Sequence, residues 1–338
     1  MDKKLKILYL PCHSILEYDE TKLFTEMGHE VFSFGSYVNP ASPHDIKRPP
    51  IDGTYNESMN RLVVRYSKDN LHPEMIEPYD VIVVQHVPEW ITNNWEKIRH
   101  KNVIWRTIGQ STSAVEMIMA DYRYDGLKVV RYSPKEKNIQ MNIGEDAVIR
   151  FYKDPEEYKD WNGSVNRVIT LGQAIQKRGA FCNYQIFEEA TRDFPRIVFG
   201  ADNDDIGGAW GGQLDYETLK KELRDNRVFF YTGTQPASYT LGFIEAMMTG
   251  IPIVSVGNQV GNSLFKNEQN TFEVPEILDN GSCGFVSDDI NTLKEKVKML
   301  LDNYDLAKRI SISAREKAIQ LFGKETIKKQ WKEFFESL

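Results

Sequence analysis

The stretch FFYTGTQPASYTLGFIEAMMTGIPIV, residues 229–254, carries most of the information about the fold. An apolar strand ends near Thr232, and a turn rich in Gly, Pro and Ser leads to a helix that begins near Ser238–Thr240. Ser238 or Thr240 is a suitable N-cap for this helix. Since a second apolar run follows at 252–256, the stretch predicts a strand–helix–strand unit with parallel strands.

Two features of this stretch indicate a ligand. The backbone N–H groups of Tyr239, Thr240 and Leu241 are expected at the helix N-terminus, where they form a ready anion site. Glu245 is an acid in an otherwise apolar helix, and a carboxylate there needs a partner such as the vicinal hydroxyls of a sugar. Together they describe a nucleotide site. The alternative is a capped core helix with Glu245 at its rim.

The rest of the chain alternates in the same way. Short apolar strands are predicted at 6–10, 30–34, 61–66, 80–85, 102–107, 128–132, 167–172, 196–200, 227–231, 252–256 and 284–287. Helical patterns are predicted at 16–28, 184–193, 215–225, 241–249, 289–302, 304–321 and 324–337. This order favours an α/β protein of two doubly wound, Rossmann-like domains that face a cleft, with ligands at the carboxyl ends of the strands.

A polar, turn-rich segment at 154–166 suggests the domain boundary. We therefore expect an N-terminal domain over residues 1–163 and a C-terminal domain over residues 164–338. The last segment, 324–337, is amphipathic and is expected to pack on its own protein. The proline-rich segment 36–60 is either a long excursion near a functional face or a surface loop.

Composition excludes several classes of protein. The 338 residues carry a net charge of −7 spread evenly over both halves, which argues against general binding of polyanions. The longest aliphatic runs, such as 81–84, are far shorter than the ~20 residues of a membrane span. The N-terminal apolar run suits a first strand better than a signal peptide. Cys12, Cys182 and Cys283 form no ligand set, so we expect buried free thiols and a cytoplasmic location.

Residues 245–254, EAMMTGIPIV, and the segment 274–301 resemble the C-terminal domain of retaining glycosyltransferases with the GT-B fold, in particular family four. The resemblance implies that Glu245 holds the ribose of a nucleoside diphosphate sugar, with UDP-glucose the commonest donor. It also implies that the last helix returns to the first domain. No metal and no cofactor besides this co-substrate is implied.

The same resemblance supplies a set of donor-binding residues. Family members carry a Gly-Arg near a strand end and a Lys-Gly that begins six residues after that glycine, where this chain has Gly172-Gln173 and Arg178-Gly179. Arg178 would bind the diphosphate, and Gln173 replaces a cation by a neutral donor. A first family glutamate, which contacts the donor sugar, is Ala237 here. The resulting donor set is Gln173, Arg178, Ser238, Tyr239, Thr240, Leu241 and Glu245.

No catalytic residue follows from the resemblance, because the histidine that the family often places after the strand at 102–107 is absent. The candidates are His13, His86 and Arg106. Both histidines lie at predicted carboxyl ends of strands, where a site is expected, although each also suits a hydrogen-bonded structural role.

Two charged segments have competing interpretations. The run at 202–205, DNDD, contains an Asp-x-Asp that holds a metal in other glycosyltransferases, but a solvated acidic turn is the simpler interpretation, and no metal site is predicted. The basic run at 97–106 suits either an anionic acceptor, such as DNA or a phospholipid head group, or a solvated helix face.

The resemblance therefore implies a retaining, metal-independent glycosyltransferase that uses a UDP-glucose-like donor. Its acceptor stays open between a glycan, a lipid-linked or small molecule, and a hydroxylated base in phage-type DNA. The alternative is an inactive nucleotide-sugar-binding or scaffold protein, an interpretation that Ala237 and Gln173 favour.

Overall fold

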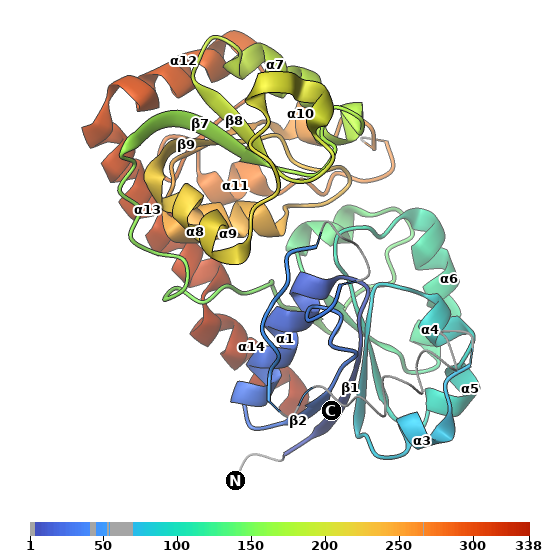
Figure 1. The fold of residues 1–338 in the computed structure, drawn as a ribbon. Helices are drawn as coiled ribbons and strands as arrows, with labels where there is room; N and C mark the ends of the chain where they lie inside the picture. The colour runs from blue at the N-terminus through green and yellow to red at the C-terminus, as the bar shows by residue number, and fades with distance from the viewer. Residues whose placement is uncertain (1–3, 41–44, 53, 55–69, 266) are drawn as a thin grey trace. The chain divides into compact units, whose positions relative to one another are not determined.

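The computed structural model describes residues 4–40, 45–52, 54, 70–265 and 267–338, so the strand predicted at 61–66 lies outside the described residues. The chain divides into two compact units (Figure 1). The first comprises Met1–Phe151 with Ile327–Leu338, and the second comprises Tyr152–Thr326.

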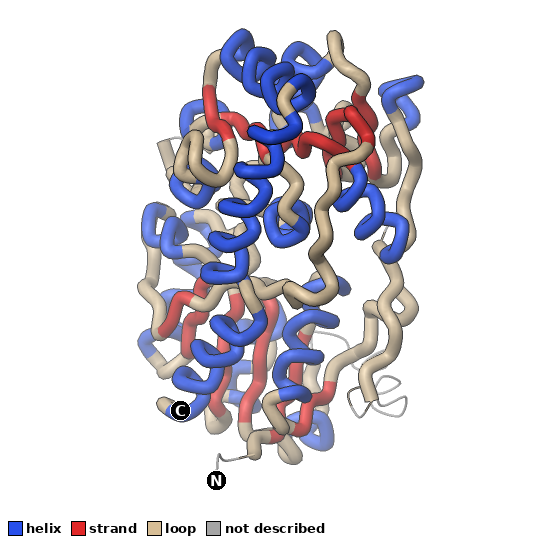
Figure 2. Tube along the Cα trace, turned by 90° about the vertical axis from the view of Figure 1, so that its left-hand side faces the viewer, coloured by secondary structure: helices blue, strands red, loops and turns tan. Residues whose placement is uncertain are grey.

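The first unit is built on a six-stranded parallel sheet in the order β2-β1-β3-β4-β5-β6. Its strands are β1 (Lys6–Leu10), β2 (Glu30–Phe32), β3 (Val81–Gln85), β4 (Asn102–Arg106), β5 (Lys128–Arg131) and β6 (Ala147–Val148). Its helices are α1 (Ser14–Glu26), α3 (Pro73–Ile76), α4 (Glu89–Thr92), α5 (Trp95–Ile98), α6 (Ser113–Tyr124), the 3₁₀ helix η1 (Pro134–Asn138) and most of α14 (Lys324–Glu336). Figure 2 shows the strands of this unit side by side, with helices packed against the sheet.

The second unit has a five-stranded parallel sheet in the order β11-β10-β9-β7-β8. Its strands are β7 (Val165–Leu171), β8 (Arg196–Phe199), β9 (Asn226–Tyr231), β10 (Ile253–Val256) and β11 (Phe285–Ser287). Its helices are η2 (Gly179–Cys182), α7 (Tyr184–Thr191), η3 (Asp204–Ala209), α8 (Tyr216–Asp225), α9 (Leu241–Thr249), α10 (Asn258–Gly261), α11 (Val274–Leu278), α12 (Ile290–Asp302) and α13 (Tyr304–Phe322). Val168, Phe230, Val254 and Val297 belong to its apolar core.

The predicted fold class is confirmed, because both sheets are parallel and doubly wound. Within the described residues, the predicted strands and helices lie within two residues of their expected bounds. The helix α6 was missed, because its pattern is inverted: Glu116 is buried on it, whereas Met117 and Ile118 are about half exposed. An ion pair between Glu116 and Arg131, at 2.6 Å, explains how that carboxylate can be buried.

The division between the units falls after Phe151, twelve residues before the expected position 163. The polar segment that follows packs on the second unit through its aromatic residues. Trp161 donates its indole N–H to the carbonyl of Asn226 at 2.8 Å and stacks on Tyr304. This segment therefore belongs to the second unit.

The end of the chain belongs to the first unit from Ile327 onward. The apolar residues of α14 face inward, and Trp331 is fully buried against Phe24, with ring centroids 4.9 Å apart at 83°. A buried aromatic face of this kind stabilises the helix through packing rather than through its own propensity.

All three cysteines are free thiols. Cys182 and Cys283 are buried as expected, but Cys12 is exposed. The difference arises because Cys12 follows β1 at the rim of the sheet, where its N–H donates to the side chain of Gln85 at 2.9 Å. In the described part of the chain, the helices are too short or too polar to cross a bilayer.

Candidate donor site and the second set of candidates

The donor candidates lie at one edge of the second sheet. β8 and β9 flank β7 on opposite sides, so the carboxyl ends of β7 and β9 form the point at which the winding reverses, where such sheets bind ligands. Gln173 and Arg178 follow β7, and the segment 238–241 follows β9. A methyl group added at Gly242 would lie 3.4 Å from the side chain of Leu171, so the first turn of α9 packs directly on the end of β7.

The turn after β7 is held by Asn203, a residue of the run 202–205 for which a solvated acidic turn is predicted. Its amide nitrogen donates to the carbonyl of Gly172 at 2.7 Å, and its amide oxygen accepts from the N–H of Ile175 at 2.8 Å. Asn203 is fully buried. It therefore fixes the backbone next to Gln173, which is exposed.

The loop after β9 is held by another buried amide, that of Gln235. Its nitrogen donates to the hydroxyl of Ser263 at 3.0 Å, and its oxygen accepts from the N–H of Leu264 at 2.8 Å. These bonds connect the loop that precedes α9 to the connection between β10 and α11. The approach to the helix N-terminus is thereby fixed before any ligand binds.

The helix α9 begins after Thr240, whose side chain does not cap it. The N–H of Thr240 donates to the hydroxyl of Tyr231 at 3.0 Å, so this one of the three predicted N–H groups already has an acceptor. Burial raises the pKa of Tyr231 well above its ordinary value, which keeps this hydroxyl neutral. The N–H groups of the first turn of α9, from Leu241 onward, have no acceptor within the helix. They carry the positive partial charge of the helix N-terminus.

The side chains of Ser238 and Tyr239 are buried. The ring of Tyr239 packs against Phe322 with centroids 5.4 Å apart. Among residues 238–241, the backbone N–H groups near Leu241 are therefore better placed to bind an anion than the buried side chains of Ser238 and Tyr239.

Arg178 is exposed, and its guanidinium has no ion pair or hydrogen bond with any residue that the structure describes. Its neighbour Lys177 instead pairs with Asp204 at 2.8 Å. Of these two adjacent cations, Arg178 is the one whose charge is not already satisfied by the protein.

Glu245 lies on α9 with only 4% of its surface exposed. Its Oε1 atom accepts a hydrogen bond from the hydroxyl of Tyr158 at 3.0 Å and lies 2.8 Å from the ammonium nitrogen of Lys153. Its Oε2 atom has no partner among the described residues. Lys153 and Tyr158 were not predicted, because both precede Glu245 by more than 85 residues and stand in an ordinary polar segment.

In the first unit, His13 and His86 lie at the same edge of the sheet, since β1 and β3 are neighbours. Gln85 connects the two ends, because its side-chain oxygen accepts from the N–H of His13 at 2.8 Å and His86 follows it directly. Burial lowers the pKa of His86, and the charge of Glu89 opposes that shift. A neutral imidazole is thus favoured at this position.

Arg106, the third candidate, is corrected by the structure to a role in the core. It is fully buried, its Nε donates to Glu20 at 2.8 Å, and one Nη donates to the carbonyl of Ile149 at 2.6 Å. Its guanidinium also lies over the ring of Phe151, 4.7 Å from the centroid. Every nitrogen of this side chain serves the first unit, so none is left to contact a substrate.

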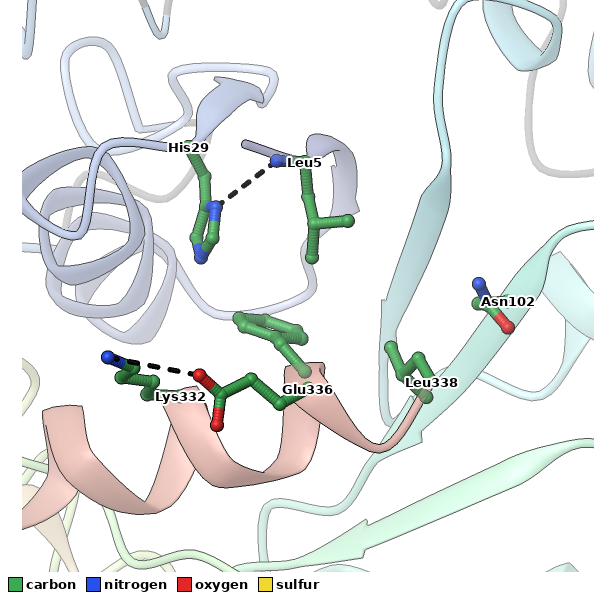
Figure 3. Close-up of a pocket in the computed structure, with 7 residues that line it drawn as sticks. Leu5, His29, Asn102, Lys332, Glu336 and Leu338 are labelled. Atoms are coloured by element: carbon green, nitrogen blue, oxygen red, sulfur yellow. Dashed lines mark hydrogen bonds and ion pairs between the residues drawn. The ribbon is translucent and has the colours of Figure 1, made fainter. Parts of the chain in front are cut away.

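The basic run at 97–106 is balanced by acids. Arg99 pairs with Asp125 at 2.9 Å, and both His100 and Lys101 lie 3.7 Å from Glu77. Arg99, His100 and Lys101 precede β4 and so lie at the amino ends of the strands. His13 and His86 lie at the opposite, carboxyl ends. A cavity of about 300 Å³ opens at the amino ends (Figure 3), lined by Leu5, His29, Asn102, Lys332, Phe335, Glu336 and Leu338.

The residues of the acidic run at 202–205 have different contacts. Asn203 holds the turn after β7, and Asp204 pairs with Lys177. No group of three or more His, Cys, Asp or Glu side chains in the described ranges is arranged to hold a metal ion.

No protein-family model matches the sequence, and no curated protein matches it. Several solved structures are similar over 99% of the chain, and they are glycosyltransferases of the GT-B fold. One is sucrose-phosphate synthase from Thermosynechococcus elongatus, at 15% identity, a TM-score of 0.67 and 99% coverage of that chain. A second is HepE from Anabaena in complex with UDP and glucose, at 13% identity, a TM-score of 0.68 and full coverage of that chain.

A third similar structure is an alpha-glucosyltransferase in complex with UDP-glucose and DNA containing an abasic site. It is 12% identical, with a TM-score of 0.62, and 99% of each chain is covered. At such identities the likeness establishes the fold: the two doubly wound units have the GT-B architecture.

Proposed function

We propose that the protein is a glycosyltransferase that takes its sugar from a nucleoside diphosphate sugar bound at the edge of the second sheet. The observation that carries the proposal is the set of unsatisfied polar groups at that edge. In the described part of the chain, the Arg178 guanidinium has no ion pair or hydrogen bond, α9 has no side-chain cap, and Oε2 of Glu245 has no partner. The first turn of α9 packs on the end of β7, the strand that precedes Arg178. A diphosphate and a ribose match these groups in charge and in hydrogen-bonding capacity.

In this proposal each group has a distinct task. Negative charge grows on the diphosphate as the bond to the sugar breaks, and Arg178 with the first-turn N–H groups of α9 stabilises that charge. Gln173 adds a neutral donor. The Oε2 atom of Glu245 accepts a hydrogen bond from a ribose hydroxyl. These groups serve the leaving diphosphate in the place where other transferases use a metal ion.

The proposed donor is UDP-glucose, transferred with retention at the anomeric carbon. Support comes from the resemblance of residues 245–254 to retaining family-four enzymes, and from the UDP-glucose present in two similar structures. His13 and His86 stay candidates for contact with the acceptor, since they share the corresponding edge of the first sheet. The acceptor is proposed to be a hydroxyl compound, with glycans, lipid-linked sugars and hydroxylated DNA bases as the classes to test.

The donor site is tested by calorimetric titration of UDP and UDP-glucose against the wild type and Glu245→Ala. Loss of a hydrogen bond to a charged group costs about 1.5–3 kcal/mol, so Kd is expected to rise by about 10- to 100-fold. Glu217→Ala is the control, because that carboxylate is exposed on α8 and, among the described residues, its ion pair is with Lys220. Equal Kd values for wild type and Glu245→Ala would refute the site.

A second function, donor binding without turnover, is favoured by one observation. Ala237 occupies the position where the resembling enzymes carry a glutamate that contacts the donor sugar. The two functions are separated by following UDP release from UDP-glucose with a panel of acceptors. Release that depends on an acceptor, with an α-linked product seen by NMR, supports the transferase. Tight donor binding with no release for any acceptor class supports the binding protein.

A further inference from the structure

Glu245 is held by two residues from the segment that follows the first unit. Lys153 and Tyr158 both bind the same carboxylate oxygen, at 2.8 and 3.0 Å. The ammonium group also lies 5.6 Å from the centre of the Tyr158 ring. The second oxygen of Glu245 is left without a partner in the described part of the chain.

The ion pair is almost entirely shielded from water, since Lys153 is 3% exposed and Glu245 is 4% exposed. A buried ion pair gains little net stability over apolar residues of the same size, because both charges lose their hydration. Its persistence at a helix face that is otherwise apolar therefore calls for a role other than stability.

The segment that supplies Lys153 is fixed to the same frame as α9. Arg315, on α13, donates to the carbonyl of Pro155 at 2.8 Å, and it also donates to the carbonyls of Tyr158 and Met248. The N–H of Lys153 donates to the carbonyl of Phe322 at 3.0 Å. Lys153 and Glu245 are thus held at a set distance by α13, and a carboxylate restrained at one oxygen presents the other in a defined direction.

We propose that Lys153, with Tyr158, is a positioning residue that makes the second oxygen of Glu245 a sensor for ribose hydroxyls, so that the site prefers ribonucleotides to 2′-deoxyribonucleotides. The proposal rests on the donor site proposed above. The ammonium and the Tyr158 hydroxyl both occupy Oε1, which leaves Oε2 as an acceptor for hydroxyl donors. Without the lysine, Glu245 gains rotamer freedom and a buried unpaired charge, and both weaken recognition of those hydroxyls.

The test is a comparison of Kd for UDP and for 2′-deoxy-UDP, measured by titration calorimetry. We expect the wild type to bind UDP about 10-fold or more tightly than 2′-deoxy-UDP, which corresponds to one charged hydrogen bond. Lys153→Met should reduce that ratio to about 1–2, mainly by weakening UDP binding. Lys153→Arg should restore much of the ratio, because a guanidinium also pairs with the carboxylate.

Lys324→Met is the matched control, since Lys324 pairs with Asp154 in the same segment at 3.2 Å and does not contact Glu245. Its ratio should equal that of the wild type. Tyr158→Phe removes only a hydroxyl and should lower the ratio of the two Kd values about 3-fold. If Lys153→Met does not fold, the result for Tyr158→Phe tests the positioning role.

The outcomes separate the two proposals. A wild type that binds neither nucleotide overturns the donor site and this inference with it. A wild type that prefers UDP, with the same preference in Lys153→Met and Tyr158→Phe, overturns the positioning role alone. Equal weakening of both nucleotides in the variants also overturns it, because a merely structural residue would act in that way.

Discussion

The two units share one architecture but use their charged residues differently. In the first unit, the arginines at the ends of β4 and β5 turn inward, where Arg106 meets Glu20 and Arg131 meets Glu116. In the second unit, the corresponding sheet edge leaves the Arg178 guanidinium and one oxygen of Glu245 without a partner among the residues that the structure describes. In these two sheets, the pairing of charges therefore decides whether a charged side chain at the carboxyl edge stabilises the fold or stays open to a ligand.

The largest expected effect concerns the inward charges of the first unit. Arg106→Met leaves Glu20 as a buried carboxylate without its cation, which should lower the free energy of unfolding by about 3–5 kcal/mol. Tryptophan fluorescence in a urea titration measures this change. Arg99→Met, which removes a half-exposed pair with Asp125, should cost less than about 1 kcal/mol. If Arg106→Met and Arg99→Met lower the free energy of unfolding by similar amounts, buried and exposed ion pairs do not differ in their effect on stability in this unit.

The next effect concerns Glu136, on η1 of the first unit. Burial raises its pKa from 4.5 to about 7, although the charge of Arg131, the hydroxyl of Thr107 and the N–H of Tyr132 act in the opposite direction. The folded protein therefore retains a proton that the unfolded chain has lost between these pH values, so stability must fall as pH rises from about 4.5 to about 7.

The size of that fall is about 3 kcal/mol, from about 1.4 kcal/mol for each pH unit of difference. Unfolding free energies measured across this pH range should show the slope in the wild type and lose it in Glu136→Gln, whose side chain does not titrate. An equal slope in both proteins would assign the pH dependence to other groups.

The smallest effect concerns the open cation of the second unit. Arg178→Ala should weaken UDP binding about 10-fold through loss of a charge-assisted contact, whereas Lys177→Ala should leave it unchanged, because Lys177 is engaged by Asp204. Uridine, which lacks the diphosphate, should bind equally to both variants. If Lys177→Ala weakens UDP binding as much as Arg178→Ala, the edge acts through its total charge rather than through one unpaired side chain.

Much of the fold followed from local patterns, because buried parallel strands such as Val81–Gln85 are continuous apolar runs. The helix α6 did not follow, since its buried Glu116 depends on Arg131, a residue on a later strand. The boundary was placed twelve residues late for a similar reason: residues near 158 look polar, yet Tyr158 and Trp161 pack on the second unit.

For the candidate site, the sequence indicated Glu245 and the helix that carries it, because an acid in an apolar helix is a local anomaly. The residues that restrain the site, Lys153, Asn203 and Gln235, were not predicted. Each of these residues acts through a contact with a residue that is distant in the sequence. The residues next to an Asn, Gln or Lys in the sequence do not indicate which distant residue its side chain will contact.

The return of Ile327–Leu338 to the first unit has a consequence for synthesis on the ribosome. The second unit, Tyr152–Thr326, is one continuous stretch, so all of its strands are made before Ile327–Leu338 emerges. The first unit is made earlier but lacks Trp331 and Phe335 until the second unit has emerged, and these residues cover Phe24. The unit that is translated first is therefore completed after the second, and until then its aromatic surface is open to association with other chains.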